Sequence, residues 1–310
     1  MRTDKAMSVL PTRELGRTGL RVTVLGYGAM ELRGAPRGRK VQTEEAGVVL
    51  NTVLDAGINY IDTSIDYGQS EELIGRSIGH RRAEYYLATK CGCQVVPDTG
   101  GTPIYTRGGG PHIYTRENIV AGVHQSLARM KTDYIDVLQF HASPPKKMLE
   151  ENDAIETVLQ LKREGKVRFI GMSSTLPELP DHIQMGIFDV FQIPYSALQR
   201  EHEEAIFQAA RAGAGIVVRG AVARGAPSEA KQKGDAWDLW QRAKLDELLD
   251  GMARMDFMLR FSISHPDLHT AIVGTINPDH LRENLRALEK GPLPPDLYAE
   301  AKRRLTSAGA

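Results

Sequence analysis

Short apolar runs alternate with longer stretches of helical spacing along this chain, from about residue 43 onward, and each alternation takes about 30 residues. The apolar runs predict strands near residues 22–28, 59–64, 85–90, 135–141, 167–173, 190–195, 215–220 and 269–275. A strand followed by a helix, repeated in this way, is typical of a parallel sheet covered by helices.

Start and stop signals mark the helices between these runs. Thr43-Glu44-Glu45 opens a helix that ends at Ala56-Gly57, where glycine is the expected C-terminal stop. Thr115 caps a segment whose apolar residues recur at helical spacing up to Met130. Asn277-Pro278-Asp279 combines a cap, a proline in the first turn and an acidic residue.

Eight strands and their crossover helices in 310 residues predict an α/β fold, the (β/α)8 TIM barrel. No linker rich in proline, serine or glycine divides the chain, so we expect one domain over residues 1–310. The segment 12–25 predicts a β-hairpin that turns at Thr18-Gly19 and caps the barrel floor. Residues 295–305 predict a final amphipathic helix and a C-terminal tail.

Composition narrows the classes of partner. The chain has 39 lysine and arginine residues and 39 aspartate and glutamate residues. Its formal net charge is therefore zero and does not attract nucleic acid or an anionic membrane. The first residues do not resemble a signal peptide, and no run approaches the roughly 20 apolar residues of a membrane span. We expect a soluble cytoplasmic protein with a small-molecule partner; no pattern indicates an oligomeric state.

Two stretches break the rhythm of short loops. Residues 94–112 are rich in glycine, proline and threonine, and residues 226–238 are polar without a clear period. Both should lie over the C-terminal mouth of the barrel, so we interpret them as covers for a cofactor or substrate. The spacing of Trp237 and Trp240 favours packing of a short helix over lining of a pocket.

Four polar side chains stand where apolar runs end or just beyond. They are Asp62, Tyr67, Lys90 and His141. If the runs are parallel strands, all four gather at the C-terminal edge of the barrel, where such folds keep their active sites.

These residue types suit proton donation to a carbonyl oxygen. A free phenol has a pKa of about 10, too high for efficient donation near neutrality. A lysine ammonium close to Tyr67 would depress that pKa, and a buried aspartate would hold the lysine charged. His141 could orient the carbonyl by a hydrogen bond. The matching half of the reaction is hydride delivery from a nicotinamide, so the pattern favours carbonyl reduction.

From Leu15 to about Leu288 the chain resembles the aldo-keto reductase family. The matching motifs are Glu14–Leu20 followed by Leu25–Gly28, then Ile61–Glu71 with its five-residue step from aspartate to tyrosine, Ala88–Lys90 and Tyr134–His141. The resemblance assigns the roles of a catalytic tetrad to the four side chains named above.

The resemblance also implies a site for the nicotinamide. Ser173, Ser174 and Gln192 would hold its carboxamide, with Ser174 standing where the family usually has asparagine. Arg219, beside Gly220, stands where many members stack an aromatic ring, and a guanidinium plane can stack in the same way. Gly28 and Ala29, at the end of the first strand, would let the backbone approach the cofactor.

The stretch from residue 274 to 284 resembles the family's site for the adenosine half of the cofactor. Its expected contacts are Gly274, Thr275, His280, Glu283 and Asn284, near a helix N-terminus with free backbone N–H groups. His280 and Gly274 stand where the family often has arginine and lysine. We therefore expect NADP(H), with NAD(H) as the competitor.

Several polar residues near the four candidate catalytic side chains are interpreted as having no chemical role. Cys91 and Cys93 are the only cysteines, and their spacing suits neither a disulfide framework nor a common zinc motif even with His141 nearby. We interpret them as free thiols and expect no metal site. Asp66 is interpreted as a solvated turn residue, and Ser70-Glu71-Glu72 as a helix cap.

Two rival functions are compatible with the sequence. Relatives of the family include channel auxiliary subunits, so a nicotinamide-binding regulatory protein with little turnover is the alternative. A barrel aldolase in which Lys90 forms a Schiff base is the third possibility. The sequence leaves the substrate and the direction of the reaction open.

Overall fold

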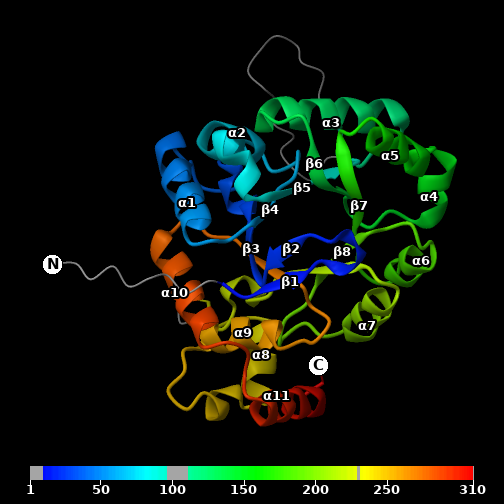
Figure 1. Cartoon of the computed structure of the whole chain (residues 1–310). Coiled ribbons are helices and arrows are strands. Elements are labelled where there is room, and N and C mark those ends of the chain that lie inside the picture. Colours follow the sequence, from blue (N-terminus) through cyan, green and yellow to red (C-terminus); the bar gives the residue numbers. More distant parts are fainter. Residues whose placement is uncertain (1–9, 96–110, 229–230, 310) are drawn as a thin grey trace.

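The computed structural model describes residues 10–95, 111–228 and 231–309. Parallel strands close into a barrel in the order β10-β3-β4-β5-β6-β7-β8-β9 (Figure 1). They are β3 Leu25–Gly28, β4 Tyr60–Asp62, β5 Tyr86–Cys91, β6 Ile135–Phe140, β7 Val167–Ser173, β8 Val190–Pro194, β9 Gly215–Arg219 and β10 Thr270–Val273. The predicted (β/α)8 barrel and all eight predicted strands are confirmed.

An N-terminal hairpin closes the floor of the barrel, as predicted. Its strands β1, Thr12–Glu14, and β2, Arg21–Thr23, pair antiparallel around the 3-10 turn Gly16–Thr18. Leu15 packs into the apolar cluster inside the barrel, against Gly215. The predicted first strand, 22–28, was too long at its start, because residues 21–23 pair within the hairpin and β3 begins only at Leu25.

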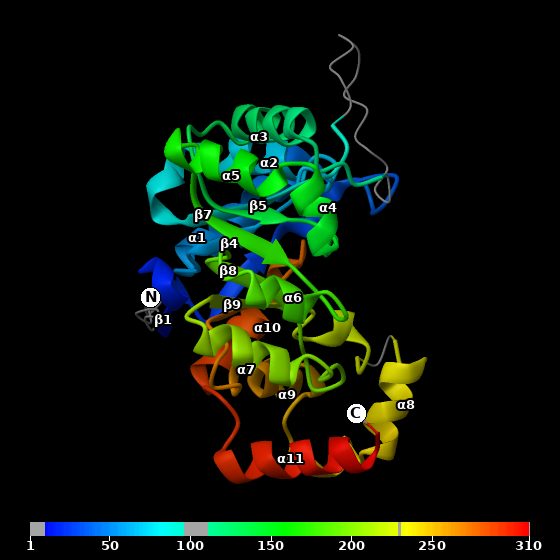
Figure 2. The same ribbon diagram turned by 90° about the vertical axis from the view of Figure 1, so that its right-hand side faces the viewer.

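Helices surround the barrel. They are α1 Thr43–Asp55, α2 Ser70–Ile78, α3 Arg116–Met130, α4 Lys146–Glu151, α5 Ala154–Arg163, α6 Leu179–Gln184, α7 Glu203–Arg211, α8 Asp235–Arg242, α9 Arg254–Ile263, α10 Pro278–Glu289 and α11 Pro295–Ser307. Short 3-10 helices are η2 Ala29–Arg33, η3 Gly79–Glu84, η4 Ala223–Gly225 and η5 Leu245–Leu248. In Figure 2 the arrow of β7 points away from the hairpin, so the C-terminal mouth lies on the opposite side of the barrel.

The predicted start of α10 and the predicted packing of the tryptophan helix agree with the structure, whereas Thr115 stands at the N-cap of α3 without a capping hydrogen bond from its side chain. The Asn277 side chain accepts a hydrogen bond from the backbone N–H of Asp279 at 2.9 Å, which caps α10. Trp240 is fully buried on α8 and meets the ring of Phe257 edge-on, 5.7 Å between centroids. Residues 96–110, most of the first predicted covering loop, and residues 229–230 of the second lie outside the described residues. The second predicted loop, 226–238, was too long at its end, because α8 begins at Asp235. Within the described ranges, no helix is both long and apolar enough to cross a membrane.

Candidate active site

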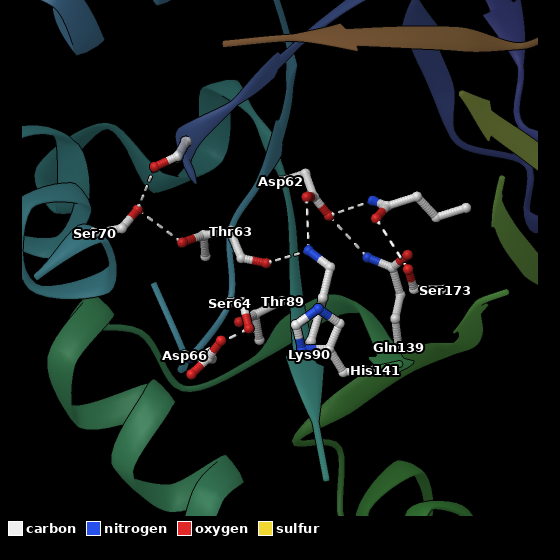
Figure 3. A network of polar contacts seen from close by, with 12 residues as sticks. Asp62, Thr63, Ser64, Asp66, Ser70, Thr89, Lys90, Gln139, His141 and Ser173 are labelled. Atoms are coloured by element: carbon white, nitrogen blue, oxygen red, sulfur yellow. Dashed lines mark hydrogen bonds and ion pairs between the residues drawn. The ribbon is translucent and has the colours of Figure 1, made fainter. Parts of the chain in front are cut away.

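The inward side chains of the barrel form two layers. Near the floor they are apolar: Tyr60, Ala88, Val137, Val190 and Val217. Two residues further along the same strands stand Asp62, Lys90, Gln139, Gln192 and Arg219. Residues two apart on a strand point to the same side, so a polar layer lies above the apolar floor. Figure 3 shows Asp62, Lys90 and Gln139 of this layer. This layer is at the C-terminal end, where barrels of this type carry their active sites.

Asp62 is the acceptor at the centre of this layer. Its Oδ1 accepts from Lys90 Nζ at 2.7 Å, and its Oδ2 accepts from Gln139 Nε2 at 2.9 Å. Gln192 Nε2 donates to the same Oδ2 at 2.8 Å. The side chains of Asp62 and Lys90 are only 3% and 1% exposed, so the ion pair is shielded from water. Such a pair is stable only when the remaining lone pairs also find donors, as they do here.

Lys90 is held at two further points. Its Nζ donates to the backbone oxygen of Thr63 at 2.7 Å and lies 4.9 Å from the centroid of the Tyr67 ring. Burial by itself would lower the pKa of Lys90, but the charge of Asp62 and the side chain of Tyr67 outweigh it and raise that pKa. The ammonium is therefore charged and aimed between the carboxylate and the phenol.

Tyr67 and His141 complete the group at the mouth. Tyr67 lies on the loop between β4 and α2, and His141 follows the last residue of β6. Their rings meet edge-on, with centroids 6.2 Å apart. The structure thus brings the four side chains together: Asp62 from β4, Lys90 from β5, Tyr67 from the loop after β4 and His141 from the end of β6.

His141 is fixed by its neighbours. Its Nδ1 lies 3.0 Å from Cys93 Sγ, and its backbone oxygen accepts from the Tyr114 hydroxyl at 2.5 Å. Burial, with the charge of Lys90 second, holds the pKa of His141 well below its usual range. Burial also raises the pKa of Cys93 to about 12. A neutral thiol that donates to Nδ1 leaves the ring proton on Nε2.

The residues expected at the nicotinamide carboxamide lie side by side. Ser173 ends β7 and pairs in register with Gln192 on β8, whose Oε1 accepts from the Ser173 hydroxyl at 3.3 Å. The Ser174 hydroxyl is buried 2.7 Å from Nδ1 of His182, and Nε2 of His182 lies 2.8 Å from the backbone oxygen of Pro144. If Nε2 donates to that carbonyl, Ser174 donates to His182 and keeps a lone pair for an amide donor.

Close packing of the backbone requires a glycine at residue 274, in addition to the expected contact with the cofactor. A Cβ there would lie 2.4 Å from the backbone oxygen of Gly28, across the β3–β10 seam. Ala29 is buried, and its backbone oxygen accepts from the Ser70 hydroxyl at 2.9 Å. The backbone oxygen of Thr275 accepts from the Tyr27 hydroxyl at 2.8 Å. The two strand ends are therefore joined closely.

The other expected cofactor contacts lie around the rim. Arg219 ends β9, and Gly220 beside it has a φ of +76° with open space where a Cβ would stand. On α10, His280 and Glu283 are exposed and Asn284 is half-buried. The exposed side chains on α10 and the open space at Gly220 leave room for a ligand along this rim.

Two sequence interpretations next to the tetrad were wrong. Asp66 is buried, not solvated, and its Oδ2 lies 3.3 Å from Arg37 Nη1. Glu71 does not cap α2: its Oε1 accepts from Thr89 and Ser126, each at 2.7 Å. Burial raises the pKa of Glu71. Asp66 therefore joins the loop that carries Tyr67 to Arg37, and Glu71 joins the start of α2 to β5 and α3.

Three residues in contact with the tetrad were absent from the predicted site. Gln139 donates to Asp62, Cys93 lies against His141, and the His112 ring centroid is 5.3 Å from that of His141. A glutamine inside the apolar run Leu138-Gln139-Phe140 was a signal in the sequence, since an inward polar residue needs a partner. His112 gave no such signal, because only the tertiary fold places it here.

Fold and site together define a barrel with a buried lysine–aspartate pair beside a tyrosine and a histidine, a constellation suited to oxidoreductase chemistry. The chain belongs to the Aldo/keto reductase family, whose model matches residues 24–304. It is therefore an oxidoreductase of a family that uses nicotinamide cofactors.

Individual relatives agree with this assignment. The chain is 28% identical over 292 residues to the uncharacterised oxidoreductase YqkF of Bacillus subtilis, with 89% of this chain and 90% of that protein covered. It is 26% identical over 308 residues to the NADH-specific methylglyoxal reductase of Escherichia coli, covering 88% and 92%. The holo form of aldo-keto reductase AKR11C1 from Bacillus halodurans superposes with a TM-score of 0.82 at 28% identity, covering 97% of each chain.

Proposed function

We propose that this protein is an NADP(H)-dependent oxidoreductase that reduces an aldehyde or ketone, or oxidises the corresponding alcohol or sugar. The observation that carries the proposal is the buried Asp62–Lys90 pair against Tyr67, with His141 at the same mouth. A nicotinamide supplies the hydride when bound. The protein's own groups then have to supply a proton and fix the carbonyl.

Tyr67 donates the proton to the carbonyl oxygen. Lys90 lies close enough to its ring to stabilise the phenolate that remains after transfer, and Asp62 keeps the ammonium in place. His141 donates from Nε2 to the same carbonyl oxygen and sets its direction toward Tyr67. In the reverse direction the same groups accept the proton of an alcohol.

Three polar side chains hold the nicotinamide ring in this proposal. Ser174 and Ser173 lie at the end of β7, and Gln192 lies beside them on β8. Arg219 is the stacking group, and the backbone at Gly28, Ala29 and Gly220 permits a close approach.

The adenosine half of the cofactor is proposed to lie along the start of α10. Thr275 and Gly274 precede the helix, and His280, Glu283 and Asn284 lie on it. Pro278 has no backbone N–H and the N–H of Asp279 is already donated to the Asn277 side chain, so a phosphate group at this end would be stabilised mainly by the favourable end of the helix dipole. His280 would stand at the 2′-phosphate where the family often has arginine, and a hydrogen bond from its ring is the reason for preferring NADP(H).

Isotope transfer tests the proposal directly. The cofactor, deuterated at C4 of the nicotinamide, is incubated with the protein and a reactive aromatic aldehyde, in separate NADPH and NADH reactions. We expect deuterium on the carbinol carbon of the product and a higher kcat/KM for NADPH. Cofactor binding without deuterium transfer over a broad carbonyl panel would instead support the regulatory alternative, and borohydride trapping of substrate on Lys90 would support the Schiff-base enzyme.

A further inference from the structure

Beside the tetrad lies a second cluster, which shares His141 with it and adds Cys93 and His112, two residues that the proposed carbonyl chemistry does not use. Cys93, His112 and His141 each offer one ligand atom, and these three atoms all lie within 4.8 Å of one another. Cys93 and His141 are in contact, with Sγ 3.0 Å from Nδ1. Thiolate and imidazole together are the ligands preferred by zinc and similar soft divalent cations.

The backbone holds the three ligands in place without a metal. Cys93 and His112 face each other in an antiparallel bridge, and the Ile113 N–H donates to the backbone oxygen of Gly92 at 2.6 Å. The Asn118 side chain donates to the Cys93 backbone oxygen at 3.0 Å. His141 is tied to the same segment through its contact with Tyr114. Little chain entropy is therefore lost when an ion joins the three side chains.

His112 has a buried donor atom that its surroundings leave unused. Its Nε2 is shielded from solvent and has no hydrogen-bond partner among the residues that the structure describes. A buried polar atom without a partner destabilises the fold, and coordination of that nitrogen to an ion would remove the penalty. The unpartnered nitrogen belongs to a residue of the same cluster as the Cys93–His141 contact, so the two observations together favour a ligand there.

We propose that Cys93 Sγ, His141 Nδ1 and a ring nitrogen of His112 form a binding site for one zinc-like divalent cation. Tetrahedral coordination with Zn–S of about 2.3 Å and Zn–N of about 2.0–2.1 Å separates the ligand atoms by roughly 3.3–3.6 Å. The Cys93–His141 contact has to open by about 0.5 Å. Three protein ligands leave the fourth position to water.

The charges near the cluster and its sulfur ligand determine which ions it can bind. Asp66 lies close enough to Cys93 and His112 to favour a positive charge, whereas Lys90 opposes one. The Cys93 thiol has to release its proton to solvent when the ion binds, so one proton leaves per ion. Hard ions such as Mg²⁺ gain too little from sulfur to drive this release, so zinc, cadmium and cobalt are favoured over magnesium and calcium.

Cobalt(II) is the probe for a direct test on the full chain after treatment with a chelator. We expect one Co²⁺ per chain, with a thiolate-to-cobalt charge-transfer band and the visible bands of tetrahedral cobalt, both abolished by one equivalent of Zn²⁺. Cys93→Ser should lose the charge-transfer band and bind at least ~10-fold more weakly. His112→Gln should weaken binding by a similar factor while the sulfur band persists at saturation.

Cys91→Ser is the matched control, because Cys91 is an equally buried free thiol two residues away and has no ligand role in this site. It should bind cobalt as the unmodified protein does. Absence of a charge-transfer band at one equivalent of Co²⁺ would overturn the site, as would equal losses in Cys91→Ser and Cys93→Ser. Circular dichroism of each variant separates loss of ligands from loss of the fold.

An effect on turnover follows if the proposed function holds. An ion between Cys93 Sγ and His141 Nδ1 shifts His141 from its resting position and places a positive charge beside Lys90. Zn²⁺ should therefore inhibit carbonyl reduction in wild type and not in His112→Gln at the same concentration. The cobalt spectrum needs no turnover. A failure of the proposed function therefore leaves the spectral test intact.

Discussion

Replacing Lys90 by methionine should destabilise the fold strongly, because it leaves the Asp62 carboxylate buried without its counter-ion. The two side chains are 1% and 3% exposed and meet at 2.7 Å. Breaking such a pair costs about 3–5 kcal/mol, since the remaining charge cannot return to water. For a chain of this size, that corresponds to a fall in Tm of about 5–8 °C.

The double variant Asp62→Asn/Lys90→Met separates charge burial from loss of packing. With both charges of the pair removed, it should be less destabilised than Lys90→Met alone, although the amide fits two facing glutamine donors imperfectly. Lys147→Met is the matched control, because its ion pair with Glu151 is 82% and 61% exposed and should contribute almost nothing.

Thermal and urea unfolding of these variants is the assay. A Lys90→Met protein that melts within about 1 °C of wild type would refute the description of a buried, charge-paired layer, since the expected cost follows directly from burial. So would a double variant no more stable than the single one.

Three further predictions concern other parts of the molecule. Burial by itself would raise the pKa of Glu203, but hydrogen bonds from Arg200 and Tyr195 outweigh it and lower that pKa from 4.5 to about 2. The stabilisation that Glu203 contributes is therefore complete above pH 4.5 and is lost as the pH falls toward 2. The stability gap between wild type and Glu203→Gln, measured as urea midpoints, should shrink over that range, and a constant gap would contradict the assignment. Gly274→Ala should cost about 1–3 kcal/mol, because its Cβ would lie 2.4 Å from the Gly28 oxygen, whereas Gly47→Ala inside α1 meets nothing closer than 3.7 Å and should be neutral or stabilising in the same melt. Asn277→Ala removes the cap of α10 and should cost about 1 kcal/mol; an unchanged melting curve would show that the helix start is held by other contacts.

Local signals were enough to predict the barrel and the place of the tetrad. Each strand is a short apolar run, and Asp62, Lys90 and His141 stand at or just after a run's end, so the closure of a parallel barrel brings them together. The residues that hold them were harder to see. Gln139 could be recognised as an inward polar residue, but its partner Asp62 is 77 residues away.

The errors have physical causes of the same kind. Val22 and Val24 continue the apolar run of β3 into the hairpin, and only the antiparallel pairing of residues 21–23 shows where one element ends. Burial of Asp66 and Glu71 depends on Arg37, Thr89 and Ser126, which come from other segments. Contacts between distant segments leave no period in the sequence.

The central claim is that Tyr67 donates the proton in a hydride-transfer reaction. Its most direct test is the steady-state rate of NADPH and NADH oxidation with a reactive aromatic aldehyde, compared between wild type and Tyr67→Phe at saturating cofactor. The account predicts an active wild type whose kcat falls by about 100-fold or more in the variant, while cofactor binding is retained. A variant as active as wild type, or a wild type that binds both cofactors and reduces nothing, would contradict it.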